Sequence, residues 1–385
     1  MRILHVTPYF YGAWAYGGIP RLSYELARAQ AALGHQVHAV TTDAMDENHR
    51  QDKPVHVPGL EVRVYPNLSN YMAYHYQFFC PRRLRAERKR AGHYDIVHVH
   101  GHRNLLNTRM AAYAFHAGVP VVLEPNGTLV NIERRQFAKR VYDLVWGSRQ
   151  VRRTSAFAAV SKAEASQMEA IGISRSCIRV LPNGVQMDSD DQARSFKNEL
   201  GIHADYVLYL GKITPRKGIE HAITALSRLS DKNLLLVIAG NDMGYAGELK
   251  RLAEELGISD RVIFTGLVTG PLKASAYQEA RYTVYAGRDE IFGLVPWESI
   301  LCGTPVIVAD DSGCGEWIKE AQAGYVVPYG DSAAIADIIE QGDSEKEMNM
   351  VERGQSFCRD RLSWSRIAKE MIEYYEEVRG WMMSS

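Results

Sequence analysis

The sequence predicts an α/β protein built from two doubly wound parallel-sheet domains. Short apolar runs of strand length alternate with helical patterns along nearly the whole chain, and this alternation is typical of parallel sheets covered by helices on both faces. The alternation stops at the turn signal Pro182-Asn183-Gly184 and then starts again. A chain of 385 residues is long enough for two such domains, each with a core of its own.

The first half of the chain carries five predicted strands and an early helix. The apolar run 3–6 leads into a helical pattern over 20–33, and Gly34 occupies the usual place of a glycine just past a helix end. Further strands are predicted at 37–41, 60–65, 96–99 and 119–123. These elements predict a first domain over residues 1–185.

The second half repeats the pattern and predicts a second domain over 200–363. It begins with a strand at 206–210 and a helix at 218–229. The remaining strands are predicted at 234–239, 262–264, 282–285 and 305–308. The last segment, 364–381, is an amphipathic helix that could cross back onto the first domain.

The composition excludes several classes of protein. Lys plus Arg and Asp plus Glu each number 45, and 46% of the residues are hydrophobic, which are ordinary globular values. They exclude a disordered tail, a histone-like polycation and a coiled coil. The five cysteines are an odd number without a Cys-x-x-Cys pair, so neither a disulfide framework nor a zinc site is indicated. We expect a cytoplasmic protein without a signal peptide or a membrane-spanning helix.

Positive charge is concentrated in the first domain. Residues 75–155 hold 15 Lys or Arg and five Asp or Glu, most densely from Arg82 to Arg90, just after an aromatic segment over 71–79. This excess favours a negatively charged partner, such as the anionic inner face of the membrane or a phosphorylated acceptor. A solvated helix face is the alternative and stays open. We expect no nucleic-acid partner, because no nucleic-acid motif accompanies the charge.

The most informative stretch begins at Glu290, just past the strand at 282–285, where open α/β sheets bind ligands. Pro296 is tolerated only in the first turn of a helix, which places a helix start near Leu294. The N–H groups of Gly293, Leu294 and Val295 would then form an anion pocket suited to a diphosphate.

Two carboxylates flank this helix start. Glu298 falls about one turn into the helix and can accept hydrogen bonds from a ribose, whereas Glu290 can hold hydroxyl groups beyond the phosphates. The alternative is that both glutamates merely favour a helix N-terminus. The order of strand, glycine, proline and two acids favours the ligand site.

Two further loops carry chemistry suited to phosphate. Lys212 and Lys217 lie in one loop after the strand at 206–210 and could converge on phosphate oxygens. Gly17 and Gly18 form a glycine loop after the first strand, although they do not match the G-x-G-x-x-G dinucleotide pattern.

Three histidines mark the end of another strand. Strand alternation places His98 and His100 on one face, and His102 follows after Gly101. No acidic residue or cysteine follows at short spacing, so we expect no metal here. The interpretation is a hydrogen-bonded histidine, His100, that opens into a cleft, and a purely structural histidine is the alternative that stays open.

At these residues the sequence resembles glycosyltransferase family 4, the retaining glycosyltransferases of the GT-B fold, over nearly its whole length. The most specific element is the Glu-x7-Glu motif of Glu290 and Glu298. The resemblance implies two Rossmann-like domains that face each other across a cleft, with the acceptor side in 1–185 and the nucleotide-sugar donor site in 200–363. It implies that no metal or cofactor is required.

The resemblance also implies roles for individual residues. Glu290, Lys217 and, from the first domain, His100 would carry catalysis. The donor-binding set would be Gly17, Gly18, Lys212, Lys217, Val268, Phe292, Gly293, Leu294, Val295 and Glu298. In this set Glu298 would contact the ribose, the two lysines the diphosphate, and the backbone near Val268 the base.

The implied activity is retaining transfer of a hexose from a nucleotide-diphosphate sugar to a glycan, lipid-linked or small-molecule hydroxyl, in cell-surface polysaccharide or glycolipid assembly. Two features depart from the family pattern. Lys212 stands where arginine is usual, which replaces a planar fork by a point charge, and Pro125-Asn126-Gly127 stands where many members have His-Gly. A nucleotide-sugar 2-epimerase and a non-catalytic sugar-nucleotide-binding subunit remain alternatives.

Overall fold

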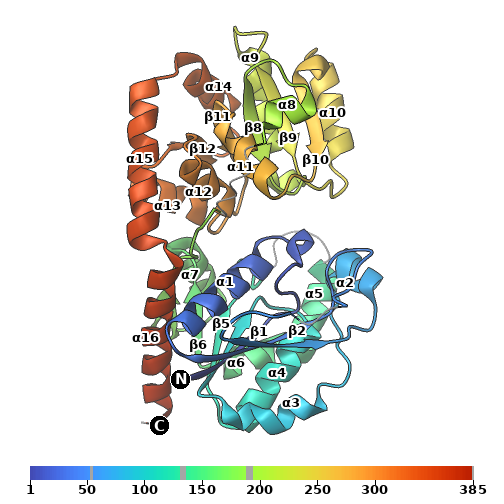
Figure 1. Ribbon diagram of the computed structural model, residues 1–385, viewed down its shortest axis with the longest axis vertical. Helices are drawn as coiled ribbons and strands as arrows, with labels where there is room; N and C mark the ends of the chain where they lie inside the picture. Colours follow the sequence, from blue (N-terminus) through green and yellow to red (C-terminus); the bar gives the residue numbers. More distant parts are fainter. Residues whose placement is uncertain (53–54, 131–135, 188–193, 384–385) are drawn as a thin grey trace. The chain divides into compact units, whose positions relative to one another are not determined.

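The computed structural model describes residues 1–52, 55–130, 136–187 and 194–383. The chain divides into two compact units, of which unit 1 comprises Met1–Gly184 with Trp364–Ser385 and unit 2 comprises Val185–Ser363 (Figure 1). The turn at Pro182-Asn183-Gly184 is therefore where the chain passes from one unit to the other.

Unit 1 is built on a seven-stranded parallel sheet in the order β3-β2-β1-β4-β5-β6-β7. Its strands are β1 Arg2–Val6, β2 Gln36–Thr42, β3 Leu60–Tyr65, β4 Ile96–His100, β5 Val121–Glu124, β6 Ala156–Ala159 and β7 Ile178–Val180. The five predicted strands are confirmed to within two residues. Sequence analysis missed β6 and β7, because an alanine-rich strand and a three-residue strand carry little apolar signal.

Helices cover both faces of this sheet. Helix α1, Gly18–Ala32, packs beside the C-terminal helix α16, Trp364–Met383, while α4, Leu105–His116, contacts β1, β4 and β5 (Figure 1). The apolar strand residues Val97 and Val99 share a buried cluster with Leu106 of α4. The remaining helices are α2 Asn70–Tyr76, α3 Arg85–Arg90, α5 Gln136–Tyr142, α6 Ser148–Arg153 and α7 Lys162–Ala170.

The C-terminal helix α16 is tied to unit 1 by hydrogen bonds and close packing. The hydroxyl group of Tyr374 donates to the carbonyl oxygens of Phe157, at 3.1 Å, and Cys177, at 3.0 Å. The ring of Trp364 lies so close to Gly184 that a Cβ there would be 2.3 Å away. A residue with a side chain at position 184 would clash with Trp364, so glycine there allows the first residue of α16 to pack against the turn.

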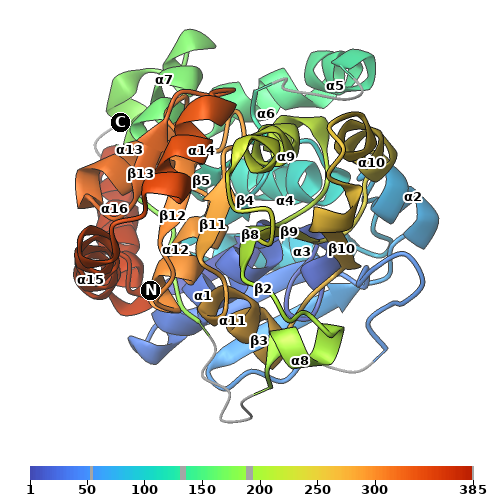
Figure 2. The same cartoon turned by 90° about the horizontal axis from the view of Figure 1, so that it is seen from above.

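Unit 2 holds a six-stranded parallel sheet in the order β10-β9-β8-β11-β12-β13 (Figure 2). The strands are β8 Tyr206–Leu210, β9 Leu235–Ala239, β10 Val262–Gly266, β11 Tyr282–Tyr285, β12 Val306–Ala309 and β13 Tyr325–Val327. The helices are α8 Phe196–Leu200, α9 Ile219–Arg228, α10 Ala246–Glu255, α11 Pro271–Gln278, α12 Leu294–Leu301, α13 Gly313–Ala321, α14 Ser332–Gln341 and α15 Ser344–Arg361. The predicted strands are again confirmed, and only the three-residue β13 was not predicted.

Both sheets have a point at which the strand order reverses direction. This switch point lies between β1 and β4 in unit 1 and between β8 and β11 in unit 2. Ligands of open α/β sheets bind beyond the carboxyl ends of the strands at such points. No helix among the residues placed by the structure is both long enough and apolar enough to cross a membrane.

Candidate active site

Two loops of unit 2 meet beyond the switch point. The first runs from the end of β8 through the 3-10 turn Pro215–Lys217, and the second runs from the end of β11 to the start of α12. Gly218 has φ of +63°, and a Cβ there would lie 2.4 Å from the carbonyl oxygen of Ala286. Glycine therefore permits the close contact that brings Lys217 beside Glu290.

Glu290 is the centre of this arrangement. Its side chain is buried, with Oε1 2.8 Å from Nζ of Lys217 and 3.2 Å from Nη1 of Arg216. Oε2 accepts a hydrogen bond of 2.7 Å from the hydroxyl group of Tyr285. Burial raises the pKa of Glu290, but the two cations and the hydrogen bonds outweigh it, so the pKa lies below its ordinary value. Glu290 is therefore an ionised acceptor held in a fixed position.

Helix α12 begins at Leu294, as the sequence predicted. Gly293 caps it with φ of +71° and without any side-chain hydrogen bond, so the N–H groups of Leu294 and Val295 have no acceptor within the helix. A Cβ on Gly293 would lie 2.9 Å from Sγ of Cys314, and the N–H group of Cys314 donates to the carbonyl oxygen of Glu290 at 2.7 Å. Cys314 of α13 thus packs against Gly293 at the helix start and also holds the backbone of Glu290.

Glu298 lies one turn further along α12 and is also buried. Its Oε2 is 2.6 Å from Nζ of Lys273 and accepts a 2.9 Å hydrogen bond from the hydroxyl group of Tyr277. Both partners come from α11, at positions four residues apart. Sequence analysis missed Lys273, Tyr277, Arg216 and Tyr285. For the first two the available signal was their i, i+4 spacing on one helix.

The other predicted donor residues of unit 2 take different places. Lys212 is half-buried two residues after β8, and its carbonyl oxygen accepts a 2.9 Å hydrogen bond from the hydroxyl group of Tyr209. Val268 is buried and packs in the same cluster as Val295. Phe292 is buried with its ring 6.4 Å from that of Trp297, so its side chain belongs to the core.

Unit 1 contributes Gly17, Gly18 and His100. Gly17 has φ of +104° and precedes α1, whose N-terminus carries no side-chain cap. A Cβ on Gly101, directly after β4, would lie 3.7 Å from the side chain of Ile19 in the first turn of α1. The start of α1 and the end of β4 are therefore neighbours at the switch point of this unit. The role of each predicted residue in binding a donor stays a prediction.

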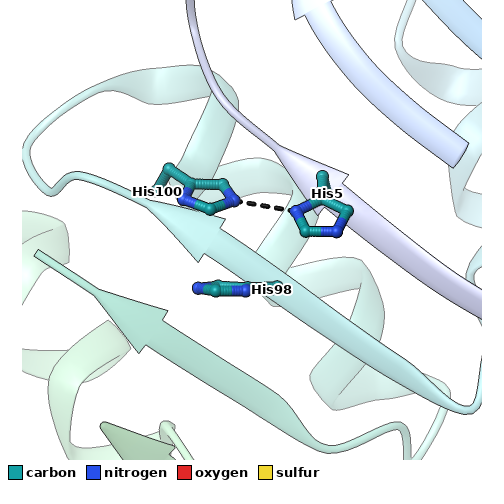
Figure 3. Close-up of side chains that lie close together, drawn as sticks. All are labelled: His5, His98 and His100. Atoms are coloured by element: carbon teal, nitrogen blue, oxygen red, sulfur yellow. Dashed lines mark hydrogen bonds between the residues drawn. The ribbon is translucent and has the colours of Figure 1, made fainter. Parts of the chain in front are cut away.

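His100 belongs to a buried cluster with His98 on the same strand, β4, and His5 on the neighbouring strand β1 (Figure 3). Its Nε2 is hydrogen-bonded to Nδ1 of His5 at 2.8 Å, and its Nδ1 lies 3.4 Å from Oε2 of Glu124. Nε2 of His98 lies 3.0 Å from the same carboxylate oxygen. The predicted placement of His98 and His100 on one face is confirmed by their stacked rings. The expected opening of His100 into a cleft is wrong, because the residue is only 1% exposed.

Residues distant in sequence complete the cluster. Nε2 of His5 is 2.8 Å from Oε1 of Gln30 on α1, and Nδ1 of His98 is 2.5 Å from the hydroxyl group of Tyr375 on α16. Gln30 also donates to that hydroxyl group at 3.4 Å. The cluster therefore joins β1, β4 and β5 to both helices on this face.

The ring planes of the cluster argue against a shared metal ion, although donor atoms of His5, His98 and His100 lie within 4.8 Å of one another. A metal ion lies in the plane of each ligating imidazole at about 2.0 Å from nitrogen. The rings of His98 and His100 are stacked, with centroids 4.1 Å apart and planes at 26°, so one ion cannot lie close to both nitrogens and in both ring planes. The geometry suits a hydrogen-bond network better.

We expect the cluster to make stability depend on pH. Burial, together with the neighbouring His100, lowers the pKa of His98 from 6.5 to about 4, against the opposing effect of Glu124. Between these two pH values the unfolded chain binds a proton that the folded chain does not, so stability falls as the pH falls from 6.5 to 4. Each such histidine adds a slope of up to about 1.4 kcal/mol per pH unit.

Urea unfolding at several pH values between about 4 and 7.5 measures this slope. The slope should be smaller in His98→Gln than in the parent. His93→Gln removes an exposed histidine of the same unit and should leave the slope nearly unchanged. An equal slope in His98→Gln and the parent would show that the cluster does not carry this dependence.

Two family models match the chain and together cover most of it. The model described as Glycosyltransferase Family 4 matches residues 16–189, and the model described as Glycosyl transferases group 1 matches residues 190–357. The two matches meet close to the boundary between the structural units.

Curated relatives carry glycosyltransferase names. D-inositol 3-phosphate glycosyltransferase of Acidothermus cellulolyticus is 28% identical over 372 residues, spanning 88% of this chain and 81% of the relative. Phosphatidyl-myo-inositol mannosyltransferase of Mycobacterium leprae is 28% identical over 393 residues, spanning 98% of this chain and 97% of the relative.

Solved structures bear out the fold. HepE of Anabaena, solved in complex with UDP and glucose, superimposes with a TM-score of 0.73 at 18% identity, covering 98% of this chain and all of HepE. At this identity the likeness speaks for the fold alone. The two parallel sheets with their helices are thus the GT-B fold, as predicted.

Proposed function

The chain belongs to glycosyltransferase family 4, and from this premise we propose that it is a retaining hexosyltransferase that uses a nucleotide-diphosphate sugar. The observation that carries the proposal is the fixed, ionised Glu290 beside the uncapped start of α12, with Lys217 at 2.8 Å. A carboxylate that can only accept hydrogen bonds suits sugar hydroxyls. Free N–H groups beside a cation suit a diphosphate.

The proposed mechanism follows from where charge develops. Departure of the nucleoside diphosphate leaves negative charge on the phosphate and positive charge on the sugar. The N–H groups of Leu294 and Val295, together with Lys217, would stabilise the phosphate. In this proposal Glu298 holds the ribose, and no group is assigned as a general base. The acceptor hydroxyl attacks the face from which the diphosphate leaves and passes its proton to the leaving phosphate, so the configuration is retained.

The donor and acceptor classes rest on the relatives. HepE has also been solved in complex with UDP-glucose, which supports a nucleotide sugar as donor. The curated relatives named for inositol phosphate and phosphatidyl-myo-inositol support hydroxyl acceptors, free or lipid-linked. We place the protein in glycolipid or cell-surface polysaccharide assembly, in the cytoplasm with peripheral attachment to the membrane, and without a metal or other cofactor.

A donor panel tests the proposal. UDP-, GDP- and ADP-sugars are incubated with the protein, with and without a lipid extract as acceptor, and nucleoside diphosphate release is measured. Release from one donor should rise when acceptor is present, and NMR of the product should show the anomeric configuration of the donor. An inverted product would contradict retention. An epimerised sugar nucleotide, or binding without turnover, would identify the chain as an epimerase or as a binding subunit.

A further inference from the structure

A helical run of unit 1 displays an apolar face that the rest of the described structure leaves uncovered. It comprises α5, the π-helical turn Asp143–Gly147 and α6, which follow one another without a break. Phe137 is 81% exposed and Leu144 is 85% exposed. Val141, Val145 and Trp146 add exposures of 43%, 52% and 44%. Isolated exposed apolar residues are ordinary, but five within ten positions form a patch.

The spacing of these residues places most of them on one side of the run. Phe137 and Val141 are four residues apart, and Leu144 and Val145 follow three and four residues later, so their side chains are neighbours on a helix. We call the surface formed by Phe137, Val141, Leu144, Val145 and Trp146 the apolar face.

The opposite side of the same run is anchored to unit 1. Asp143 forms a two-pronged ion pair with Arg103, with Nε 3.0 Å from Oδ1 and Nη2 2.9 Å from Oδ2. Gly147 is buried, and a Cβ there would lie 2.5 Å from Asp143 and 3.2 Å from His102. Polar contacts thus fix the orientation of the run, and the apolar face must point outward.

The charge around the apolar face is positive. Arg140, Arg149 and Arg152 are exposed on the same run. Asp143 is the one acidic residue between positions 136 and 153, and Arg103 already neutralises it. The apolar face is bordered by arginines, and Asp143 points away from it toward Arg103. Such a face complements an anionic bilayer, which has an apolar interior and negatively charged headgroups.

We propose that the apolar face inserts into the headgroup layer of an anionic phospholipid bilayer and holds unit 1 on the membrane. Leu144 and Phe137 would enter the acyl boundary, Trp146 would lie at the interface, and the arginines would contact lipid phosphates. The attachment surface is therefore α5 to α6 rather than the segment from Arg82 to Arg90 that the sequence suggested. Within that segment Leu84 is buried and α3 offers charge without an apolar face. The aromatic residues that precede it are less exposed, at most 58% for Tyr71, than Phe137 and Leu144.

The surface lies close to the site residues of unit 1. Arg103, the partner of Asp143, follows His100 by three residues and also donates to the carbonyl oxygens of Thr128 and Leu129 in the loop after β5. A bilayer at the apolar face would therefore bring lipid-linked hydroxyl groups near the carboxyl ends of β4 and β5. Membrane binding itself requires neither the proposed reaction nor its acceptor, so it is measured without substrate.

Co-sedimentation of the full chain with phosphatidylcholine vesicles, with and without phosphatidylglycerol, tests the proposal. Binding should require phosphatidylglycerol and weaken with added salt. The double variant Phe137→Ser/Leu144→Ser should bind about tenfold more weakly or worse, from the apolar area removed. Ile171→Ser, at a 51% exposed position of the same unit, is the matched control and should bind as the parent does.

A second measurement locates the contact. Tryptophan emission should shift to the blue when anionic vesicles are added, and Trp146→Phe should lose that shift while circular dichroism stays unchanged. Three results would overturn the proposal. These are no vesicle binding at low salt, parental binding by the double variant, and loss of binding only in Arg82→Ser/Arg83→Ser/Arg85→Ser. A dimer that dissociates on Leu144→Ser and ignores vesicles would instead assign the apolar face to a second copy of the chain.

Discussion

Glu290→Gln should lose most transfer activity while the protein keeps its fold. The substitution preserves shape but removes the negative charge that Lys217 and Arg216 hold in place at 2.8 and 3.2 Å. If the carboxylate holds the transferred sugar as charge develops, kcat should fall about 10²- to 10³-fold, or about 3–4 kcal/mol of transition-state stabilisation. Steady-state kinetics with the donor identified by the panel measures the effect, and thermal unfolding checks the fold.

Glu298→Gln provides a contrast within the same helix. Its proposed contact is with the ribose, which does not react, so the variant should mainly raise the KM for the donor and change kcat little. Glu352→Gln, at an exposed position of α15, is the control for the loss of one carboxylate from unit 2. Equal kinetics of Glu290→Gln and the parent would remove Glu290 from the site.

The parts of this site that the sequence predicted are those fixed by local rules. Pro296 fits only the first turn of a helix, so the start of α12 at Leu294 followed from one residue type. His98 and His100 are two positions apart on one strand, and residues with that spacing point to the same face of the sheet. Glu290 and Lys217 each lie in a loop just after a predicted strand. Because the carboxyl ends of parallel strands lie at one edge of a sheet, the sequence predicted that both residues belong to one site.

The parts that sequence analysis missed depend on contacts between distant segments. Tyr375 meets His98 across 277 positions, and Lys273 meets Glu298 only because α11 packs beside α12. No local pattern specifies such pairs. The burial of His100 also depends on distant segments. Strand alternation predicts the face on which His100 lies, but α1 and α16 cover that face.

Lys217→Gln should weaken binding of the nucleoside diphosphate product more than Lys212→Gln does. Lys217 would contact phosphate oxygens, and a charge-assisted hydrogen bond is worth about 1.5–3 kcal/mol, or about 10- to 150-fold in Kd. Lys217 has a second effect, because its ammonium neutralises Glu290 at 2.8 Å. Calorimetric titration with the diphosphate at two salt concentrations measures both variants, with Lys319→Gln on α13, an exposed lysine, as the control.

The double variant Lys217→Gln/Glu290→Gln separates the two effects of Lys217. In Lys217→Gln the buried carboxylate loses Lys217 and keeps the Arg216 contact at 3.2 Å, so its less neutralised charge repels the incoming phosphates. Removing that charge should restore part of the lost affinity, and Glu290→Gln alone should bind the diphosphate at least as tightly as the parent does. If the double variant instead binds more weakly than Lys217→Gln, Glu290 does not face the phosphates. If all four proteins bind equally, the diphosphate lies away from both loops at the switch point of unit 2.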